Sequence, residues 1–321
     1  MGKLVQFIRG GLLWRRLAQV LPVVVFATFV AFGLLKLIPG DVAVTLAGDN
    51  ASEARIAEIR QLYGLDRSFL AQYASWIGHA VQGDLSKSLL SGEAVADSIA
   101  RCLPSTLLIV ALALVFALAI GAPLGILAAS RAGGWIDTVV MSIASVGVAV
   151  PNFWVAMILI SFLALEMGWF PATGAVPLST SVGGALHHAL LPAIALAAGG
   201  MAEIARQLRG SLIELLASQQ VRTLHAKGLS PAVILWKHCL KNVGINLLTV
   251  LTLLANRMLG ATVVLEAVFA IPGIGSLIVG AAIQRDVPVV QGVVLVMVLI
   301  VLCLNLLADL LYGAIDPRVK T

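Results

Sequence analysis

Long runs of apolar residues, several of them free of any charge, constrain this chain more than any other feature. A helix needs about 20 mostly apolar residues to cross a bilayer, because hydrocarbon cannot satisfy backbone N–H and C=O groups. Six segments meet or approach this requirement: Leu17–Leu35, Leu103–Ser130, Thr138–Leu165, Ala189–Ala202, Asn242–Leu265 and Val287–Ala308. The sequence therefore predicts an all-α integral membrane protein with six transmembrane helices.

Composition excludes the other broad classes of protein. The chain is 60% hydrophobic and 12% charged, whereas soluble domains are roughly 45–50% apolar and about 25% charged. It lacks the polar residues to cover a water-facing surface, which excludes both a soluble enzyme and a disordered protein. The sequence contains no GxxxxGK(S/T), HExxH or GxSxG motif, so we expect no catalytic residue and no metal site in this chain.

Basic residues indicate the orientation of the helices. With the N-terminus inside, most of the 21 lysines and arginines fall on the cytoplasmic side, as the positive-inside rule favours. A seventh apolar stretch, Ala267–Ile283, is interrupted at Ile271–Gly275, and counting it as a span would move Arg318 and Lys320 outside. We therefore expect both termini in the cytoplasm and a short re-entrant or surface-lying segment at 267–283.

The spans divide the chain into four parts. Residues 1–16 form a cytoplasmic amphipathic segment, 17–38 the first transmembrane helix, 39–102 an extracytoplasmic cap, and 103–321 a transmembrane core with a cytoplasmic loop at 206–242. The apolar residues spaced for an interfacial helix in the first part are Leu4, Phe7, Ile8 and Leu12.

The cap has the pattern of two short helices. Ser52 can cap a helix over Ser52–Tyr63, and Ser68–Val81 follows as a second helical stretch. The apolar residues of the second stretch fall on one stripe, and they are Phe69, Tyr73, Trp76 and Ile77. We therefore expect a small ordered cap rather than an irregular loop.

The cytoplasmic loop at 206–242 is basic and is interrupted by Gly228 and Pro231. Leucines at helical spacing predict a helix over Ser211–Ala226. Gly228 suits the left-handed position that ends a helix, and Pro231 suits the first turn of the next one. The pattern predicts a helix, a tight turn and a second helix. A basic loop that merely obeys the positive-inside rule is the alternative.

At this loop the sequence resembles a known family. Residues 221–230, VRTLHAKGLS, resemble the EAA-type loop of bacterial ABC importer permeases, in the form found in the peptide/nickel (dipeptide and oligopeptide) permease family. Other motifs that resemble this family occur in the expected order: Gly64–Arg67, Gly83–Leu85, Leu103–Leu107, Pro151–Trp154, Lys237–Asn242, Glu266–Phe269, Pro272–Gly273, Pro288–Gly292 and Asp316–Arg318. The resemblance covers nearly the whole chain.

The resemblance implies the type I importer fold and a set of partners. Such a permease pairs with a homologous second permease in the bilayer, and two ABC ATPase subunits bind ATP and magnesium beneath the pair. An extracytoplasmic solute-binding protein delivers the cargo, which would be a peptide, nickel or a metal chelate. The implied location is the bacterial cytoplasmic (inner) membrane, and neither a cofactor nor nucleic acid is implied for this chain.

The same resemblance assigns a role to the cytoplasmic loop. The helix that ends near Gly228 would dock in a groove of an ATPase subunit and couple its movement to the permease. The residues implied in this coupling are Val221, Arg222, Thr223, Ala226, Lys227, Gly228, Leu229 and Ser230.

Several residues depart from the usual pattern of the family. Leu224 stands where the family usually has alanine, Ser86 stands where a glycine usually follows Gly83–Leu85, and Arg257 stands near a position that usually holds a small residue. An arginine at the centre of a spanning helix costs roughly 2.5–3.5 kcal/mol and usually faces a cavity or a partner. Arg257 is therefore expected to attract a substrate carboxylate or to pair with an acid of the partner permease. A snorkelling or structurally paired arginine is the alternative.

Four residues are assigned to the substrate path: Arg257, Asn256, Pro151 and Asn152. Two other classes of protein stay open at this point. One is a secondary transporter or channel that works alone, against which the sequence shows no paired inverted repeats and no chain of intramembrane acids. The other is a membrane sensor or scaffold with residues 39–102 as its sensor domain. Copurification with an ATPase distinguishes both from an importer subunit.

Overall fold

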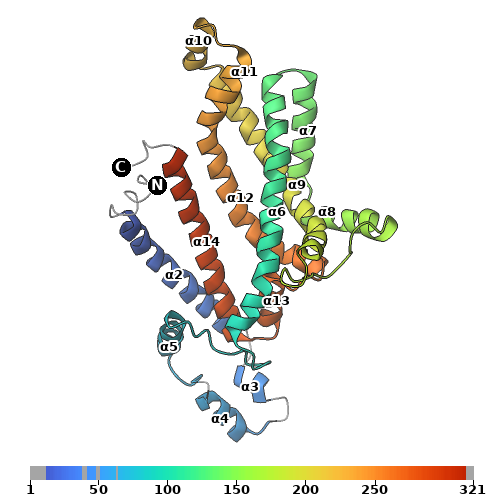
Figure 1. Ribbon diagram of the computed structural model, residues 1–321. Coiled ribbons are helices and arrows are strands. Elements are labelled where there is room, and N and C mark those ends of the chain that lie inside the picture. Colours follow the sequence, from blue (N-terminus) through green and yellow to red (C-terminus); the bar gives the residue numbers. More distant parts are fainter. Residues whose placement is uncertain (1–11, 38–41, 48–50, 63, 316–321) are drawn as a thin grey trace. The chain divides into compact units, whose positions relative to one another are not determined.

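The computed structural model describes residues 12–37, 42–47, 51–62 and 64–315 (Figure 1). The amphipathic segment expected before Leu12 and the motif Asp316–Arg318 lie outside these described residues. Contacts divide the chain into two compact units. The first unit consists of Met1–Arg101 with Leu277–Leu302, and the second of Cys102–Ser276 with Cys303–Thr321.

The cap helices of the first unit begin where the sequence predicts. The unit contains α2 (Leu12–Leu37), α3 (Val42–Ala47), α4 (Glu53–Leu62) and α5 (Phe69–Val81). Ser52 Oγ accepts the backbone N–H of Arg55 (3.4 Å) at the start of α4, and Ser68 Oγ accepts that of Ala71 (3.4 Å) at the start of α5. These side chains satisfy N–H groups that a first helical turn leaves without partners. Both predicted helices are confirmed.

An aromatic cluster forms a core in the first unit. Tyr73 and Trp76 of α5 are buried with Phe32 of α2 and with Leu295, which lies on α14 (Val287–Ile315). The rings of Phe32 and Tyr73 meet edge to face with centroids 5.7 Å apart. Tyr73 Oη also shares a 2.9 Å hydrogen bond with Thr28 Oγ1. The predicted apolar stripe of the second cap helix is therefore confirmed, and it packs α5 onto α2.

A tight reversal follows α5. Ser86 has a φ of 68°, in the left-handed region that glycine adopts without steric cost, which explains why a glycine is usual here. Ser88 Oγ then donates a hydrogen bond to the carboxylate of Asp286. A Cβ added at Gly292 would lie 3.7 Å from Leu85. Two segments that resemble the family, far apart in sequence, are thus neighbours in the first unit.

The second unit is built mainly from long helices. In chain order its long and short helices are α6 (Val95–Ser130), α7 (Trp135–Ala149), α8 (Asn152–Leu159), the π-helical η1 (Ile160–Glu166), α9 (Val182–Leu216), α10 (Gln219–Ala226), α11 (Pro231–Val233), the π-helical η2 (Ile234–Cys239) and α12 (Leu240–Val268). α13 (Ile274–Ile283) begins in the second unit and continues in the first. The boundary between the units falls within α6, α13 and α14. α9 packs against α7, α8 and α12, and α10 and α11 lie at one end of these helices (Figure 1).

Length and apolarity confirm a membrane fold. Among the described residues, four helices can cross a bilayer: α6, α9, the continuous stretch Pro231–Val268, and α14 over Val287–Gly313. α7 with α8 and η1 makes a fifth if this bent pair counts as one span. In α2, which has 26 residues, the apolar stretch Leu21–Leu34 is shorter. The all-α membrane fold is confirmed, and the number of six spans stays a prediction.

Two expected spans need correction. Thr138–Leu165 is not one helix, because the axis bends by 98° between α7 and α8. Pro151 lacks an N–H and holds Val150 extended (φ −82°, ψ 126°), which ends α7. Ala189–Ala202 is only the middle of α9, which has 35 residues and continues through the polar residues on the C-terminal side.

Glycines bring α6 and α9 close together. A Cβ added at Gly121 would lie 2.5 Å from the carbonyl oxygen of Met201, and one at Gly125 would lie 2.6 Å from that of Ala205. Real Cβ atoms do not approach so closely, so only glycine permits this contact between backbones. The spacing of four residues is the small-xxx-small pattern by which membrane helices pack.

Candidate functional site

The loop that the sequence predicts to be cytoplasmic, at 206–242, folds into an elbow, which we define as residues 208–243. The helix expected over Ser211–Ala226 is not continuous, and this is a correction. α9 ends at Leu216, and α10 begins at Gln219 after Ser218, whose Oγ accepts the N–H of Val221 at 3.4 Å. A serine cap competes with helix continuation, because its hydroxyl replaces a backbone acceptor.

The turn of the elbow has the predicted geometry. Gly228 has a φ of 78°. The N–H of Gly228 donates to His225 O (2.9 Å) and that of Leu229 to Leu224 O (3.3 Å), which is the Schellman pattern of a helix end. Pro231 then occupies the first turn of α11, with Ser230 as its N-cap. The predicted helix, tight turn and helix are present after the break at Ser218.

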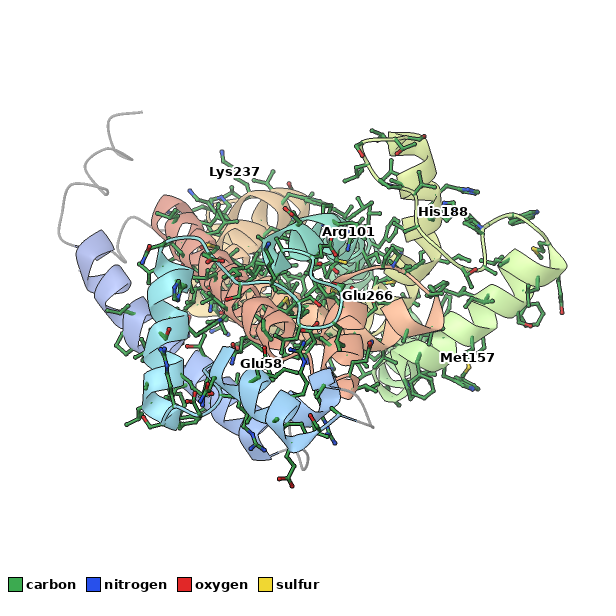
Figure 2. All side chains as sticks on the ribbon, turned by 90° about the horizontal axis from the view of Figure 1, so that it is seen from below. Glu58, Arg101, Met157, His188, Lys237 and Glu266 are labelled. Atoms are coloured by element: carbon green, nitrogen blue, oxygen red, sulfur yellow. The ribbon has the colours of Figure 1, made fainter. Side chains whose placement is uncertain are left out.

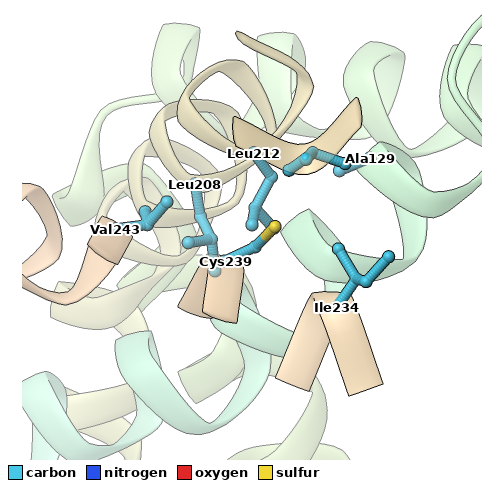
Figure 3. Packing of buried hydrophobic residues seen from close by; sticks show 7 residues of the cluster. Ala129, Leu208, Leu212, Ile234, Cys239 and Val243 are labelled. Carbon is cyan, nitrogen blue, oxygen red and sulfur yellow. The ribbon is translucent and has the colours of Figure 1, made fainter. Parts of the chain in front are cut away.

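An apolar cluster fixes the elbow to the long helices. It contains Ala129, Leu208, Leu212, Val221, Ile234, Cys239 and Val243, all buried. Figure 3 shows Leu208 and Leu212 of α9 pointing toward Cys239 of η2. Burial of side chains of this size stabilises a fold by roughly 1.5–3 kcal/mol each. α9, α10 and η2 therefore share one core.

The eight residues implied in coupling divide into two groups. Val221 is buried in the apolar cluster, and Leu229 packs against it. The exposed members of the set are Arg222, Thr223, Ala226, Lys227, Gly228 and Ser230. Leu224, which departs from the family's alanine, also packs against the cluster. The elbow thus has an apolar inner side that packs against the long helices and an exposed, mostly polar outer side.

A buried glutamate closes the break between α12 and α13. Glu266 is fully buried; its Oε1 accepts a 2.6 Å hydrogen bond from Thr106 Oγ1, and its Oε2 accepts the N–H of Ser276 at 2.9 Å. Thr106 Oγ1 in turn accepts the N–H of Ile274 at 2.9 Å. In Figure 2, Glu266 lies among the helices, whereas Met157 lies on the outward arm of α8. α13 has 10 residues, too few to cross a bilayer.

An ion pair that the sequence did not reveal joins α7 to α9. Arg209 contacts Asp137 through two nitrogens, Nε to Oδ1 and Nη2 to Oδ2, the latter at 2.6 Å. Asp137 Oδ2 also accepts the N–H of Gly133 at 2.9 Å. The Asp137 side chain is 5% exposed and that of Arg209 is 30% exposed. Two-nitrogen contact and burial mark this pair as a structural clamp.

Arg257, the arginine within α12, pairs with Glu203 of α9. The contact joins Arg257 Nη2 to Glu203 Oε2, and the side chains are 59% and 29% exposed. Sequence reasoning missed Glu203 because the expected span ended at Ala202. An acid one residue beyond an apolar run, opposite an arginine within another span, is the signal that could have found it.

The other residues assigned to the substrate path lie in two different places, one next to α14 and the other next to α9. Asn256 Nδ2 donates to Asn305 Oδ1 of α14 at 3.1 Å, while Asn256 Oδ1 is buried with no partner among the described residues. Pro151 and Asn152 lie at the bend between α7 and α8. A Cβ added at Gly199 of α9 would lie 3.7 Å from Asn152 Oδ1. The structure therefore brings Asn152 and Arg257 to α9 but directs Asn256 toward α14.

The sequence of the chain matches known membrane transport proteins over nearly its whole length. Residues 121–321 match the family described as binding-protein-dependent transport system inner membrane component, and residues 9–112 match the N-terminal family of such membrane components. The chain is 37% identical over 326 residues to the dipeptide transport system permease protein of Alkalihalophilus pseudofirmus, covering 95% of this chain and 98% of that protein. It is 35% identical over 309 residues to the oligopeptide transport system permease protein of Bacillus subtilis, again covering 95% and 98%.

The fold also resembles a solved structure. An inward-facing conformation of a methionine ABC transporter superposes with a TM-score of 0.56 and 21% identity. The match covers 68% of this chain and 96% of that chain. At this identity the likeness concerns the fold alone.

Proposed function

The chain belongs to the family of binding-protein-dependent transport system inner membrane components, and from this membership we propose that it forms, with a homologous permease, the translocation path of an ATP-driven importer. Two ABC ATPase subunits bind ATP and magnesium and dock on the elbow. An extracytoplasmic solute-binding protein delivers the cargo. Both termini lie in the cytoplasm, and this chain contributes no catalytic residue.

The construction of the elbow carries the proposal. α10 holds Val221 in the apolar cluster, while Arg222, Thr223 and Ala226 stay exposed on its outer surface. A short helix fixed on one side and free on the other can receive a partner without losing its own packing. Because Leu208, Leu212 and Cys239 join it to α9 and η2, a rigid-body movement of that partner reaches the long helices.

The proposed cargo is a peptide. The two relatives described above are named for the transport of dipeptides and of oligopeptides, at identities of 37% and 35% over nearly the whole chain. Neither name supports the nickel or metal-chelate cargo that the sequence resemblance also implies. A transporter that works alone, or a membrane sensor, is not favoured, because α10 would then expose its outer surface for no partner.

A bulky substitution on the outer surface of α10 tests the proposal. Ala226→Trp enlarges an exposed residue of α10 and leaves the apolar cluster untouched. In the assembled transporter we expect it to abolish uptake of a labelled dipeptide and to reduce copurification of the ATPase subunits, with unchanged amounts of permease in the membrane.

The matched control is Ala71→Trp, which enlarges an exposed alanine of α5. It should leave copurification of the ATPase subunits intact. Full uptake and full copurification in Ala226→Trp would contradict docking at the elbow. Equal loss of the ATPase subunits in both variants would do so as well.

A further inference from the structure

The pair Arg257–Glu203 joins two long helices at positions away from their ends. Each residue is about three helical turns or more from either end of its helix, α12 for Arg257 and α9 for Glu203. A charge within a membrane-spanning helix is costly unless it faces a partner or a water-filled cavity. The opposite signs of the two side chains make the net charge of the pair zero.

The pair is open, unlike the other arginine pair on α9. Arg209 engages Asp137 through two nitrogens, whereas Arg257 engages Glu203 through Nη2 alone. A guanidinium carries five N–H donors. The Arg257 side chain is about twice as exposed as that of Arg209, at 59% against 30%. Arg257 therefore retains donors that a further anionic group can use.

A third polar group lies one turn along the same helix. Gly199 and Glu203 are four residues apart on α9, so they lie on one face. The amide oxygen of Asn152 is beside Gly199, and the Asn152 side chain is half-buried. The ion pair of Glu203 with Arg257 and the amide of Asn152 thus lie about one turn apart along the same face of α9.

We propose that Arg257 and Glu203 form a binding site for the two charged ends of a short peptide, an inference that rests on the proposed transport of peptides. The terminal carboxylate accepts hydrogen bonds from the free nitrogens of Arg257. The terminal ammonium donates to the carboxylate of Glu203, and Asn152 is placed to hydrogen-bond a peptide group. A site whose charges sum to zero favours a zwitterion over an anion or a cation, since binding then buries no net charge.

Equilibrium binding to the assembled transporter, purified without its solute-binding protein, tests this site. The probes are dialanine, which has both terminal charges, its C-terminal amide, which lacks the carboxylate, and its N-acetyl form, which lacks the ammonium. The wild-type transporter should prefer dialanine to either derivative by about tenfold, the loss expected for one charge-assisted hydrogen bond. Arg257→Gln should abolish the preference over the amide and keep the preference over the N-acetyl form. Glu203→Gln should do the reverse.

Two further variants separate recognition from folding. Arg257→Lys keeps the positive charge and should keep the preference over the amide. Leu253→Gln adds a neutral polar group one turn from Arg257, at an exposed position of α12, and should leave both preferences unchanged. Preferences that persist in Arg257→Gln and Glu203→Gln would overturn the site. So would separation of the two permeases by Arg257→Gln with both preferences intact, since Arg257 would then serve the contact with the partner permease.

Uptake by the complete wild-type transporter distinguishes failure of this inference from failure of the proposed function. Absence of any labelled peptide uptake, with the solute-binding protein present, would remove the peptide proposal and this site with it. Uptake of dialanine by the wild type, together with unaltered preferences in both glutamine variants, would remove the site alone.

Discussion

Glu266 and Glu203 are both acids within long apolar helices, and the structure surrounds them in opposite ways. Glu266 is fully buried and is held by neutral donors, the hydroxyl of Thr106 and the backbone N–H of Ser276. Glu203 is 29% exposed and meets a cation, Arg257, that is itself more than half exposed. The side chain of Glu266 is closed off from the surface, whereas that of Glu203 is partly exposed.

The difference separates an acid that holds the fold from an acid that is available for binding. Hydrogen bonds to Glu266 close the break between α12 and α13, where Pro272 and Gly273 interrupt the helix. Asp137 lies between the two cases, because it is nearly buried yet paired with an arginine. Burial and the number of hydrogen bonds, rather than charge alone, therefore decide which acids are structural.

Removing a hydrogen-bond donor of buried Glu266 should have the largest effect on stability. Thr106→Val removes the donor to Glu266 and the acceptor of the Ile274 N–H with little change of shape. Unsatisfied buried groups cost about 1–3 kcal/mol each, so we expect a loss of that size in the free energy of unfolding in detergent. Thr106→Ser, which keeps the hydroxyl, should lose less. Equal stability of the two variants would show that Glu266 is not held in this way.

Weakening the clamp between α7 and α9 should come next. Asp137→Asn keeps the shape but removes the charge that faces both nitrogens of Arg209. We expect the midpoint of thermal unfolding to fall by several degrees, because a partly buried guanidinium loses its counter-ion. Asp97→Asn, at an exposed acid in the first turn of α6, is the control and should change the midpoint less. A midpoint like that of the wild type in Asp137→Asn would refute the clamp.

Removing the charge of Glu203 should affect stability still less. In Glu203→Gln the partner Arg257 keeps an exposed side chain, 59% of its surface, which in the proposed peptide site faces water rather than lipid. Exposed ion pairs contribute about 0–1 kcal/mol, so the free energy of unfolding should change by less than that. The same measurement as for Thr106→Val applies. A loss as large as that of Thr106→Val would make Glu203 a structural residue and erase the contrast.

The smallest effect is expected at a surface pair of the cap. Hydrogen bonds from Arg101 and Ser98 lower the pKa of Glu93 from 4.5 to about 2. The ionised form is therefore favoured by folding, and its stabilisation is present above about pH 4.5 and is lost as the pH falls toward 2. Glu93→Gln should be slightly less stable than the wild type at neutral pH, and unfolding curves of the two should converge near pH 2. A difference in stability between the two proteins that grows as the pH falls would contradict this effect of Glu93.

Local features of the fold could be predicted from the sequence. Ser68 caps α5, and Gly228 ends α10 with a left-handed conformation, because these residue types act within a single turn. The apolar runs likewise identify the long helices, since bilayer thickness fixes their length. The assignment of Arg257 as a charge that needs a partner rests on the same local reasoning.

Features that depend on distant segments could not be predicted. The partner of Arg257 is 54 residues away on another helix. The position of Glu203 just beyond an apolar run makes it a candidate, but the pairing itself depends on how the two helices pack. The hydrogen bonds of Glu266 join segments 160 residues apart. The break at Ser218 was hidden because leucines continue at helical spacing across it, and the size of the bend at Pro151 depends on packing against α9.

Labelling of a thiol on α10 during active transport tests the central claim most directly. The variant carries Ala226→Cys with Cys303, an exposed native thiol, replaced by alanine, and its labelling rate is compared in the permease alone and in the working transporter. Docking of an ATPase subunit predicts strong protection of Cys at position 226 in the working transporter, with unchanged labelling of a cysteine placed at exposed Leu70 of α5. An equal rate in both states, while uptake continues, would contradict entry of ATP-driven movement through the elbow.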